Sequence, residues 1–138
     1  MKLFVDTWGW LALEDQRDAG HVAAARCYQE RTKSAGRIVT SNFVLDETLT
    51  LLFRRRPFEE AWQFASALLK SPSISIELVT DARFRRALEL RRRYADKPAI
   101  SFTDLSSMVI MQDLKLSDVM TADRHFSQLG LGFRVFPA

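Results

Sequence analysis

The sequence predicts an α/β protein with a central parallel sheet of about five short strands flanked by helices. First, short apolar runs alternate with longer amphipathic stretches, a pattern typical of parallel strands joined by helical crossovers. Second, the length of 138 residues suits one domain spanning residues 1–138. Third, 47% of the residues are hydrophobic and 27% are charged, so the chain can bury a core and is not disordered.

The first half of the chain begins with an apolar run that stops at Asp6, which predicts a buried strand. Either Ser41 or Asn42 caps a later helix, because their side-chain oxygens accept hydrogen bonds from free first-turn N–H groups. The elements predicted here are strand 2–5, helix 8–14, helix 20–33, strand 38–40 and helix 43–55.

In the second half, Pro57 suits the first position of a helix, where no backbone N–H is needed. Thr80 or Asp81 caps a later, basic helix, and the segment that starts at Ser101 opens another. The elements predicted here are helix 58–70, strand 74–79, helix 82–94, helix 101–114, strand 118–121 and strand 133–136.

Composition excludes several classes of protein. No apolar run approaches the roughly 20 residues that span a bilayer, and the first ten residues lack the apolar stretch of a signal peptide. We therefore expect a cytoplasmic protein with no membrane contact. The lone Cys27 cannot form an internal disulfide and argues against a structural zinc site. A formal net charge of +3 permits an anionic partner without demanding one.

Four carboxylates stand out by their positions. Asp6 and Asp123 end predicted strands, Asp104 lies in the first turn of a predicted helix, and Glu47 lies about one turn into another. Ligands of open α/β sheets bind outside the carboxyl ends of the strands, so the four acids can converge at one edge. Hard divalent cations such as Mg²⁺ prefer oxygen ligands, whereas a carboxylate cluster without a cation is unfavourable.

Each acid also has a purely structural interpretation. Asp104 follows Ser101 by three residues, as in a capping box, and Asp6 and Asp123 each fit a turn. Glu47 fits an exposed helix position, where the adjacent Asp46 is a rival for any role. The remaining aspartates singled out as surface or capping residues are Asp46, Asp81, Asp96, Asp113 and Asp118.

Four segments together resemble the PIN-domain ribonucleases, most closely the VapC toxins of type II toxin–antitoxin systems. They are LFVDTWGW, TSNFVLDETLTLL, SFTDLSSMVIM and VMTADRHF, they occur in the family's order, and the resemblance covers essentially the whole chain. The resemblance implies a single PIN-like domain with endoribonuclease activity. It further implies Mg²⁺ or Mn²⁺ as cofactor, RNA as substrate, a VapB-type antitoxin as partner and a homodimer.

The resemblance also assigns residues. It makes Asp6, Glu47, Asp104 and Asp123 the metal ligands and catalytic residues, with RNA phosphodiester bonds hydrolysed by metal-activated water. Thr7, Thr103 and Ser107 match polar positions beside the acids, which implies contact with substrate.

Basic and aromatic residues supply further candidates for RNA binding. Arg54, Arg55 and Arg124 are the candidates for contact with phosphate, with a solvated position as the alternative, and the other clustered arginines are expected to be solvated. Trp8 and Trp10 flank the first acid and either stack on bases or belong to the core, which is the commoner role. The remaining assignments are mainly structural: core or partner packing for Phe58, Trp62 and Phe64, core positions for Met108 and Met111, and a structural role for His125, with contact to phosphate as its alternative.

Two other functions stay open at this point. One is a catalytically silent PIN-like module that binds RNA or protein. The other is a phosphatase with Asp6 as nucleophile, although Trp8 stands where the haloacid dehalogenase type needs a second Asp. The sequence leaves undetermined the RNA target, the number of metals, the choice between Mg²⁺ and Mn²⁺, the antitoxin and the dimer geometry.

Overall fold

A computed structural model describes residues 2–34 and 36–137, and it contains the predicted parallel sheet. All five strands run parallel, in the order β3-β2-β1-β4-β5. The chain therefore starts in the middle of the sheet, builds outward on one side, and then crosses to the other. The strands are β1 (Leu3–Val5), β2 (Ile38–Ser41), β3 (Ile74–Glu77), β4 (Asp118–Met120) and β5 (Arg134–Phe136).

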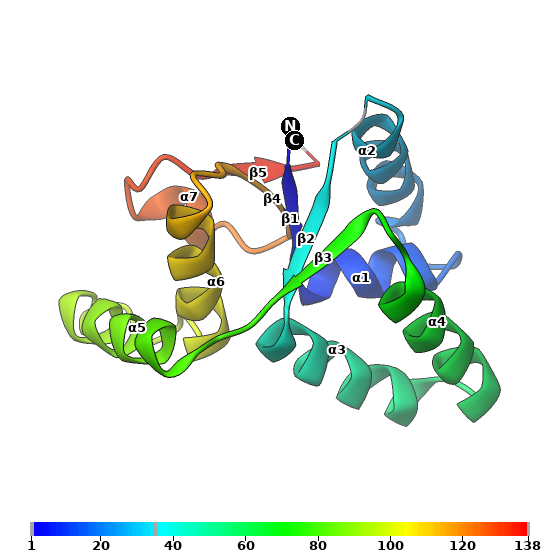
Figure 1. The fold of residues 1–138 in the computed structure, drawn as a ribbon, viewed down its shortest axis with the longest axis horizontal. Coiled ribbons are helices and arrows are strands. Elements are labelled where there is room, and N and C mark those ends of the chain that lie inside the picture. The colour runs from blue at the N-terminus through cyan, green and yellow to red at the C-terminus, as the bar shows by residue number, and fades with distance from the viewer. Residues whose placement is uncertain (1, 35, 138) are drawn as a thin grey trace.

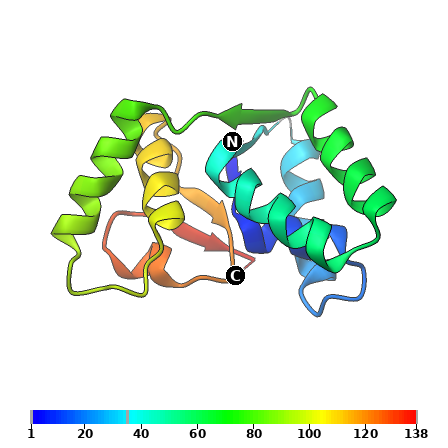
Figure 2. The same cartoon turned by 90° about the horizontal axis from the view of Figure 1, so that it is seen from below.

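Helices cover both faces of the sheet. Figure 1 shows α1, α2 and α4 on one side and α5, α6 and α7 on the other, and Figure 2 shows the same separation from below. The helices are α1 (Thr7–Glu14), α2 (His21–Lys33), α3 (Asn42–Arg55), α4 (Phe58–Lys70), α5 (Asp81–Arg93), α6 (Phe102–Asp113) and α7 (His125–Gln128). In the part of the chain that the structure describes, no helix is both long and apolar enough to cross a membrane.

The predicted elements are confirmed to within two residues at each end, and the sequence reasoning missed one helix. Helix α7 has only four residues, which is too short for a periodic pattern. The caps resolve the open choices: Ser41 accepts a hydrogen bond from Val44 N, and Thr80 accepts one from Arg83 N. Pro57 is the N-cap of α4 rather than its first helical residue.

Helix α1 lies directly on the centre of the sheet because of Gly9. A Cβ at this position would lie 2.8 Å from Val5 Cγ1 and 3.1 Å from the backbone oxygen of Met120. Val5 ends β1 and Met120 ends β4, so the glycine brings α1 against the two central strands. This close approach fixes the start of α1, where Asp6 lies.

Helix α6 is the most deeply buried helix of the fold. All eight residues from Asp104 to Met111 are buried, including the predicted core positions Met108 and Met111. The helix packs against α5 and contacts α3, so it has no solvent-facing stripe over these turns. The first of its buried residues is Asp104, and an ionisable group is thereby held in a largely apolar setting.

The expectation that Asp118 lies at the surface is wrong. This residue begins β4, is only 3% exposed, and contacts two arginines. Arg31 of α2 lies 2.6 Å from its Oδ2, and Arg134 of β5 lies 2.8 Å from its Oδ1. The two guanidinium groups make the burial of this carboxylate tolerable, and they join α2 and β5 to the centre of the sheet.

The strand order marks one crevice as the place for a ligand. Strands β1 and β4 are neighbours, yet the chain leaves them in opposite directions across the sheet. In open parallel sheets, ligands bind at the carboxyl ends beside such a reversal. Asp6 follows β1 there, and Thr121 and Asp123 follow β4.

Candidate metal centre

Asp6 is held at the carboxyl end of β1 with one oxygen left unpartnered. The residue is 5% exposed, and its Oδ2 accepts a hydrogen bond from Thr121 Oγ1 at 3.0 Å. Its Oδ1 is buried and meets no hydrogen-bond donor among the described residues. Buried polar atoms are nearly always partnered in folded proteins, so this oxygen marks a place where a cation or its water fits.

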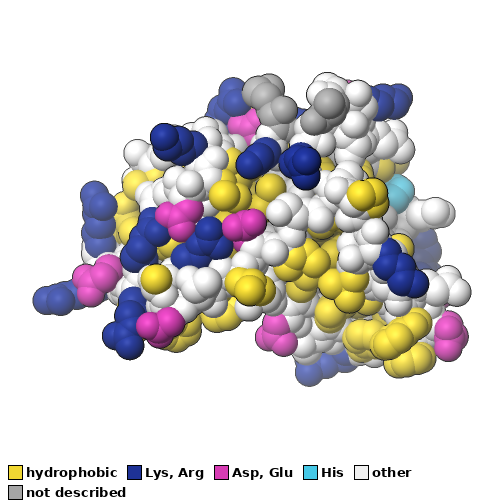
Figure 3. Space-filling view, in the orientation of Figure 1, with side chains coloured by type: hydrophobic (Ala, Val, Ile, Leu, Met, Phe, Trp, Pro, Cys, Tyr) yellow, Lys and Arg dark blue, Asp and Glu magenta, His cyan; other side chains and the backbone are white. Residues whose placement is uncertain are grey.

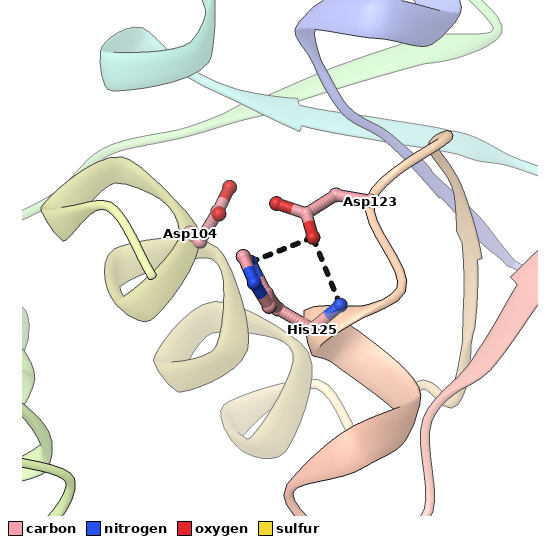
Figure 4. A group of neighbouring side chains, drawn as sticks. All are labelled: Asp104, Asp123 and His125. Atoms are coloured by element: carbon pink, nitrogen blue, oxygen red, sulfur yellow. Dashed lines mark hydrogen bonds and ion pairs between the residues drawn. The ribbon is translucent and has the colours of Figure 1, made fainter. Parts of the chain in front are cut away.

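Asp104 and Asp123 reach the same place from other elements. Asp104 lies in the first turn of α6, where its N–H donates to Ser101 Oγ at 3.0 Å, so the predicted cap is present. Asp123 lies in the loop after β4. Figure 4 shows the two carboxyl groups and the His125 ring turned toward one another, and one ligand atom from each lies within 4.8 Å of the others.

His125 fixes one oxygen of Asp123. Its backbone N–H donates to Asp123 Oδ1 at 2.8 Å, and its ring Nδ1 lies 2.7 Å from the same oxygen. The ring contact has an ion-pair distance without hydrogen-bond geometry, so Nδ1 has no hydrogen-bond partner in residues 2–34 and 36–137. The structure thus places beside the acids a histidine for which the sequence favoured a structural role over contact with phosphate.

Burial and mutual repulsion raise the pKa values of two acids. Burial is the largest cause for Asp6, and the charges of Glu47 and Asp123 add to it, so its pKa rises to about 6. Burial is again the largest cause for Asp104. Its pKa rises to about 8, with further contributions from Asp6 and from a hydrogen bond and charge of Asp123. The cluster therefore holds protons near neutrality and favours a cation that replaces them.

Glu47 lies on the open side of this cluster. It is exposed, yet its charge acts on Asp6, as expected for a carboxylate facing the site from the second turn of α3. Together with Thr103 and Asp46, it lines a hollow of about 590 Å³ between α3 and the start of α6. All four predicted acids thus lie at one edge of the sheet, with Glu47 toward solvent.

The remaining predicted site residues lie in different settings. Thr7 is buried, and its Oγ1 meets no partner among the described residues. Ser107 is fully buried and donates to the Thr103 carbonyl at 3.0 Å, so its hydroxyl faces the helix rather than solvent. Arg54 and Arg55 are exposed in the last turn of α3, and Arg124 is exposed directly after Asp123.

Thr121 is the site residue that sequence reasoning missed. Its Oγ1 donates to Asp6 Oδ2 and accepts from Asp123 N, both at 3.0 Å. One hydroxyl therefore positions an acid from each central strand. Its signal in the sequence was its place two residues before Asp123, but its bond to Asp6 depends on the pairing of β1 with β4.

The donor set fits a hard divalent cation. Carboxylate oxygens converge from three separate elements, one buried oxygen of Asp6 lacks a donor among the described residues, and a fourth carboxylate lies toward solvent. Oxygen ligands of this kind suit Mg²⁺ or Mn²⁺, which keep several waters when bound. An imidazole beside them is compatible with Mn²⁺.

The fold, with acids gathered at the carboxyl ends of its parallel strands, defines a class of α/β domain, and comparison with known families agrees. The PIN-domain family model matches residues 3–131, so the chain belongs to the PIN-domain family. The family predicted from the four sequence segments is confirmed.

Among individual relatives, the 23S rRNA-specific endonuclease VapC20 of Mycobacterium tuberculosis is 34% identical over 128 residues, covering 93% of this chain and 94% of that protein. A VapC ribonuclease of Archaeoglobus fulgidus is 28% identical over 134 residues, covering 96% of this chain and 83% of that protein. The predicted likeness to VapC toxins is thereby confirmed.

Solved structures agree with the fold. The crystal structure of M. tuberculosis VapC20, described as a sarcin–ricin loop cleaving toxin, superposes with a TM-score of 0.81 and covers 93% of this chain and 95% of its own. VapBC2 of Rickettsia felis, bound to a promoter DNA fragment, superposes with a TM-score of 0.76 at 15% identity, covering 98% of this chain and 97% of its own. At that identity, the second match shows a shared fold alone.

Proposed function

We propose that this protein is a divalent-metal-dependent endoribonuclease and the toxin component of a type II toxin–antitoxin system, with Mg²⁺ or Mn²⁺ as its cofactor. The observation that carries this proposal is the convergence of four carboxylates at the β1–β4 crevice of a PIN domain. Buried acids with raised pKa values, set beside one another at a ligand-binding crevice, are typical of catalytic sites rather than of structural acids.

In this proposal, Asp6, Asp104 and Asp123 hold the cation and Glu47 completes the site from the open side. Thr121 positions Asp6, because its hydrogen bond holds Oδ2 and leaves the buried Oδ1 available to a cation. His125 positions Asp123 in the same way through its backbone N–H. When bound, the cation supplies an activated water and neutralises charge that develops on the phosphate.

Substrate contacts are assigned by exposure. Arg124 adjoins the acids and is exposed, so it is the first candidate for contact with an RNA phosphate. Arg54 and Arg55 extend this basic surface along α3, and Thr103 lies in the hollow beside Glu47. Thr7 and Ser107 are buried, and the Ser107 hydroxyl donates to the Thr103 carbonyl, so neither is a leading candidate for contact with RNA.

A structured RNA loop is the first substrate to test. The relative with 34% identity is a 23S rRNA-specific endonuclease, and its crystal structure is that of a toxin that cleaves the sarcin–ricin loop. Proteins read RNA specifically in loops and unpaired bases rather than in regular helices. We therefore propose a loop in structured RNA as the substrate class.

The proposal includes protein partners and a cytoplasmic location, where such an RNA is found. A VapB-type antitoxin and a second copy of the chain are the expected partners. An exposed aromatic group supports such contacts: Phe58 and Trp62 are 61% and 54% exposed and stack at 5.8 Å, next to Phe53. Figure 3 shows hydrophobic side chains gathered over α3 and α4.

The test is cleavage of a sarcin–ricin loop hairpin and a mixed RNA panel with Mg²⁺ or Mn²⁺. Asp104→Asn and EDTA should each abolish cleavage, and Glu47→Gln should lower it. The matched control is Asp46→Asn, since Asp46 is an exposed acid beside Glu47 in the same hollow. Equal cleavage by wild type and Asp104→Asn would contradict the assignment, and RNA binding without cleavage by any variant would support the silent binding module.

A further inference from the structure

A second hollow adjoins the acids, and the function proposed above assigns no part of the RNA to it. Its volume is about 320 Å³, and its walls include Trp8, Thr121, Ala122 and Arg124, with α7 and β5 closing the rest. Thr121 is common to this hollow and to the acidic centre, where it bonds both Asp6 and Asp123. The hollow therefore opens directly beside the place where a phosphate would react.

Trp8 is anchored along one edge of its ring. The residue is half-buried in the first turn of α1, two positions after Asp6. A Cβ at Gly20 would lie 2.7 Å from Cζ2 and 3.2 Å from Cη2 of this ring, so only glycine leaves room for it there. The fold thus holds the indole in place while part of it remains a wall of the hollow.

The neighbouring Trp10 shows what a purely structural tryptophan looks like in this chain. It is 2% exposed, its Nε1 donates to Thr40 Oγ1 at 3.0 Å, and its ring packs against Tyr28 and Phe64. The two tryptophans weighed together in the sequence therefore differ. Trp10 is buried in the core and lines only a separate hollow that holds none of the four acids, whereas Trp8 is half-buried in the hollow beside them.

Arg124 supplies a free positive charge to the same hollow. Other arginines of the chain form ion pairs: Arg31 with Asp118, and Arg83 and Arg86 with Asp113. Arg124 is exposed and forms no ion pair with any residue in the described ranges. A planar aromatic ring and an unpaired guanidinium that line the same hollow suit a planar base with an attached phosphate.

We propose that this hollow receives one unpaired nucleobase of the RNA next to the cleaved bond, with Trp8 stacking on the base and Arg124 contacting its phosphate. The inference rests on the proposed function for its choice of RNA as ligand. Unpaired bases are the feature that proteins stack on aromatic side chains in RNA loops. Trp8 then contributes to binding and to cleavage-site choice, and takes no part in bond breaking.

The experiment combines changes in the RNA with changes in the protein. Sarcin–ricin loop hairpins carry an abasic nucleotide at each loop position in turn. In the wild type, one abasic position should lower kcat/KM about 5- to 150-fold, the range for loss of one base stack. Trp8→Ala should lower cleavage of the intact hairpin by a similar factor and abolish the response to that abasic position. Trp8→Phe should restore most of the response.

Controls separate this pocket from general effects. Trp62→Ala removes an exposed tryptophan from α4 and should leave the response unchanged. Thermal unfolding of each variant shows whether it is folded. If Trp8→Ala does not fold, Arg124→Ala tests the same hollow. Arg92→Ala removes an exposed arginine from α5 as its match. If Trp8→Ala responds to abasic RNA as the wild type does, the base pocket is wrong while the nuclease stands.

A binding measurement keeps the two proposals apart. Fluorescence anisotropy of the same labelled hairpins is measured with Asp104→Asn protein in Mg²⁺, alone and combined with Trp8→Ala. If the wild type cleaves no RNA in the first experiment, but the effects of the abasic position and of Trp8→Ala on binding are coupled, the pocket stands and the nuclease is wrong. If the hairpins bind with no such coupling, or do not bind at all, the pocket is overturned.

Discussion

Thr121 shows how much of the site depends on one hydroxyl. It ties Asp6 and Asp123 together although 115 residues separate Thr121 from Asp6 in the chain. A hydroxyl can donate one hydrogen bond and accept others, which is the combination this position uses. Valine has a similar shape but would leave Asp6 Oδ2 and Asp123 N without this partner.

Cation affinity should rise with pH. The pKa of Asp6 is about 6 and that of Asp104 is about 8, and a cation requires both in the charged form. Between about pH 6 and 8, the Kd for Mn²⁺ should fall by up to about tenfold per pH unit for each proton released. Isothermal titration calorimetry in two buffers of different ionisation enthalpy measures the Kd for Mn²⁺ and the number of protons released on binding. A Kd independent of pH would contradict the raised pKa values.

Without a divalent cation, Asp104→Asn should stabilise the fold at pH 8. The folded-state pKa values of Asp6 and Asp104 lie above the ordinary value of 3.8, so the folded state binds more protons than the unfolded state. The free energy of unfolding therefore falls as pH rises from about 4 to about 8. Removing the Asp104 charge should recover about 1–3 kcal/mol at pH 8 and little near pH 4.

The measurement is urea unfolding of both proteins at the two pH values in EDTA. Adding Mn²⁺ should make the wild type the more stable of the two proteins, because the cation stabilises the wild type by mass action and binds the variant less well. A variant less stable than the wild type at pH 8 without cation would show that the cluster is not under electrostatic strain.

At the scale of elements, the carboxylate of Asp118 connects three parts of the fold. It starts β4, Arg31 approaches it from α2, and Arg134 approaches it from the edge strand β5. Arg31 is also stacked over the Phe136 ring, with its guanidinium carbon 4.9 Å from the ring centre. These contacts lie at the end of the strands opposite to the acidic centre.

We predict that Asp118→Asn destabilises the protein by about 3–5 kcal/mol, because it leaves the largely buried Arg31 without its counter-charge. Arg134→Ala should cost less than about 1 kcal/mol, since that side chain is 63% exposed. Chemical denaturation followed by circular dichroism measures both. Similar losses for the two variants would indicate that Arg134, rather than Arg31, carries the interaction.

Local sequence patterns predicted most of the elements, and their failures have physical causes. The Ser41 and Thr80 caps and the four acids follow from short-range chemistry that a single chain displays. Helix α6 was predicted from its start at Ser101, although its residues from Asp104 to Met111 are all buried and give no polar face. The burial of Ser107 and the exposure of Phe58 follow from packing between elements, which periodicity does not describe.

The candidate site was predicted in part for the same reason. Asp6, Glu47, Asp104 and Asp123 were predicted because strand ends and helix starts are local features. The roles of Thr121 and His125 depend on strand order and on the four-residue helix α7, neither of which the sequence pattern determines. The buried ion pairs of Asp118 could not be predicted from the sequence, because they depend on how α2 and β5 lie relative to β4.

At the scale of the whole molecule, charge is distributed unevenly. The formal net charge is only +3, but Lys and Arg side chains gather over α5 in Figure 3, while the acidic centre lies at the edge of the sheet. Several α5 arginines are already paired with acids, such as Arg83 and Arg86 with Asp113. Unpaired arginines near the acids are therefore expected to dominate RNA binding.

RNA affinity should fall with salt, and Arg124 should contribute to that slope. Each phosphate contact with single-stranded RNA contributes about −0.7 to the slope of log K against log salt. Arg124→Ala should therefore make the slope less steep by about 0.7, whereas Arg92→Ala should leave it unchanged. Fluorescence anisotropy titrations at KCl concentrations from about 50 to about 300 mM measure this slope. If Arg92→Ala changed the slope more than Arg124→Ala does, the RNA would be bound along α5 instead.

The strand order also determines when during synthesis the protein can become active. β1 is complete after five residues, but its neighbour β4 begins only at Asp118, and Thr121 and Asp123 come later still. A chain still emerging from the ribosome carries Asp6 and Glu47 while the other half of the crevice is unmade. Such a nascent chain has no assembled centre. The toxicity proposed here would then appear only once translation of the whole domain is almost finished.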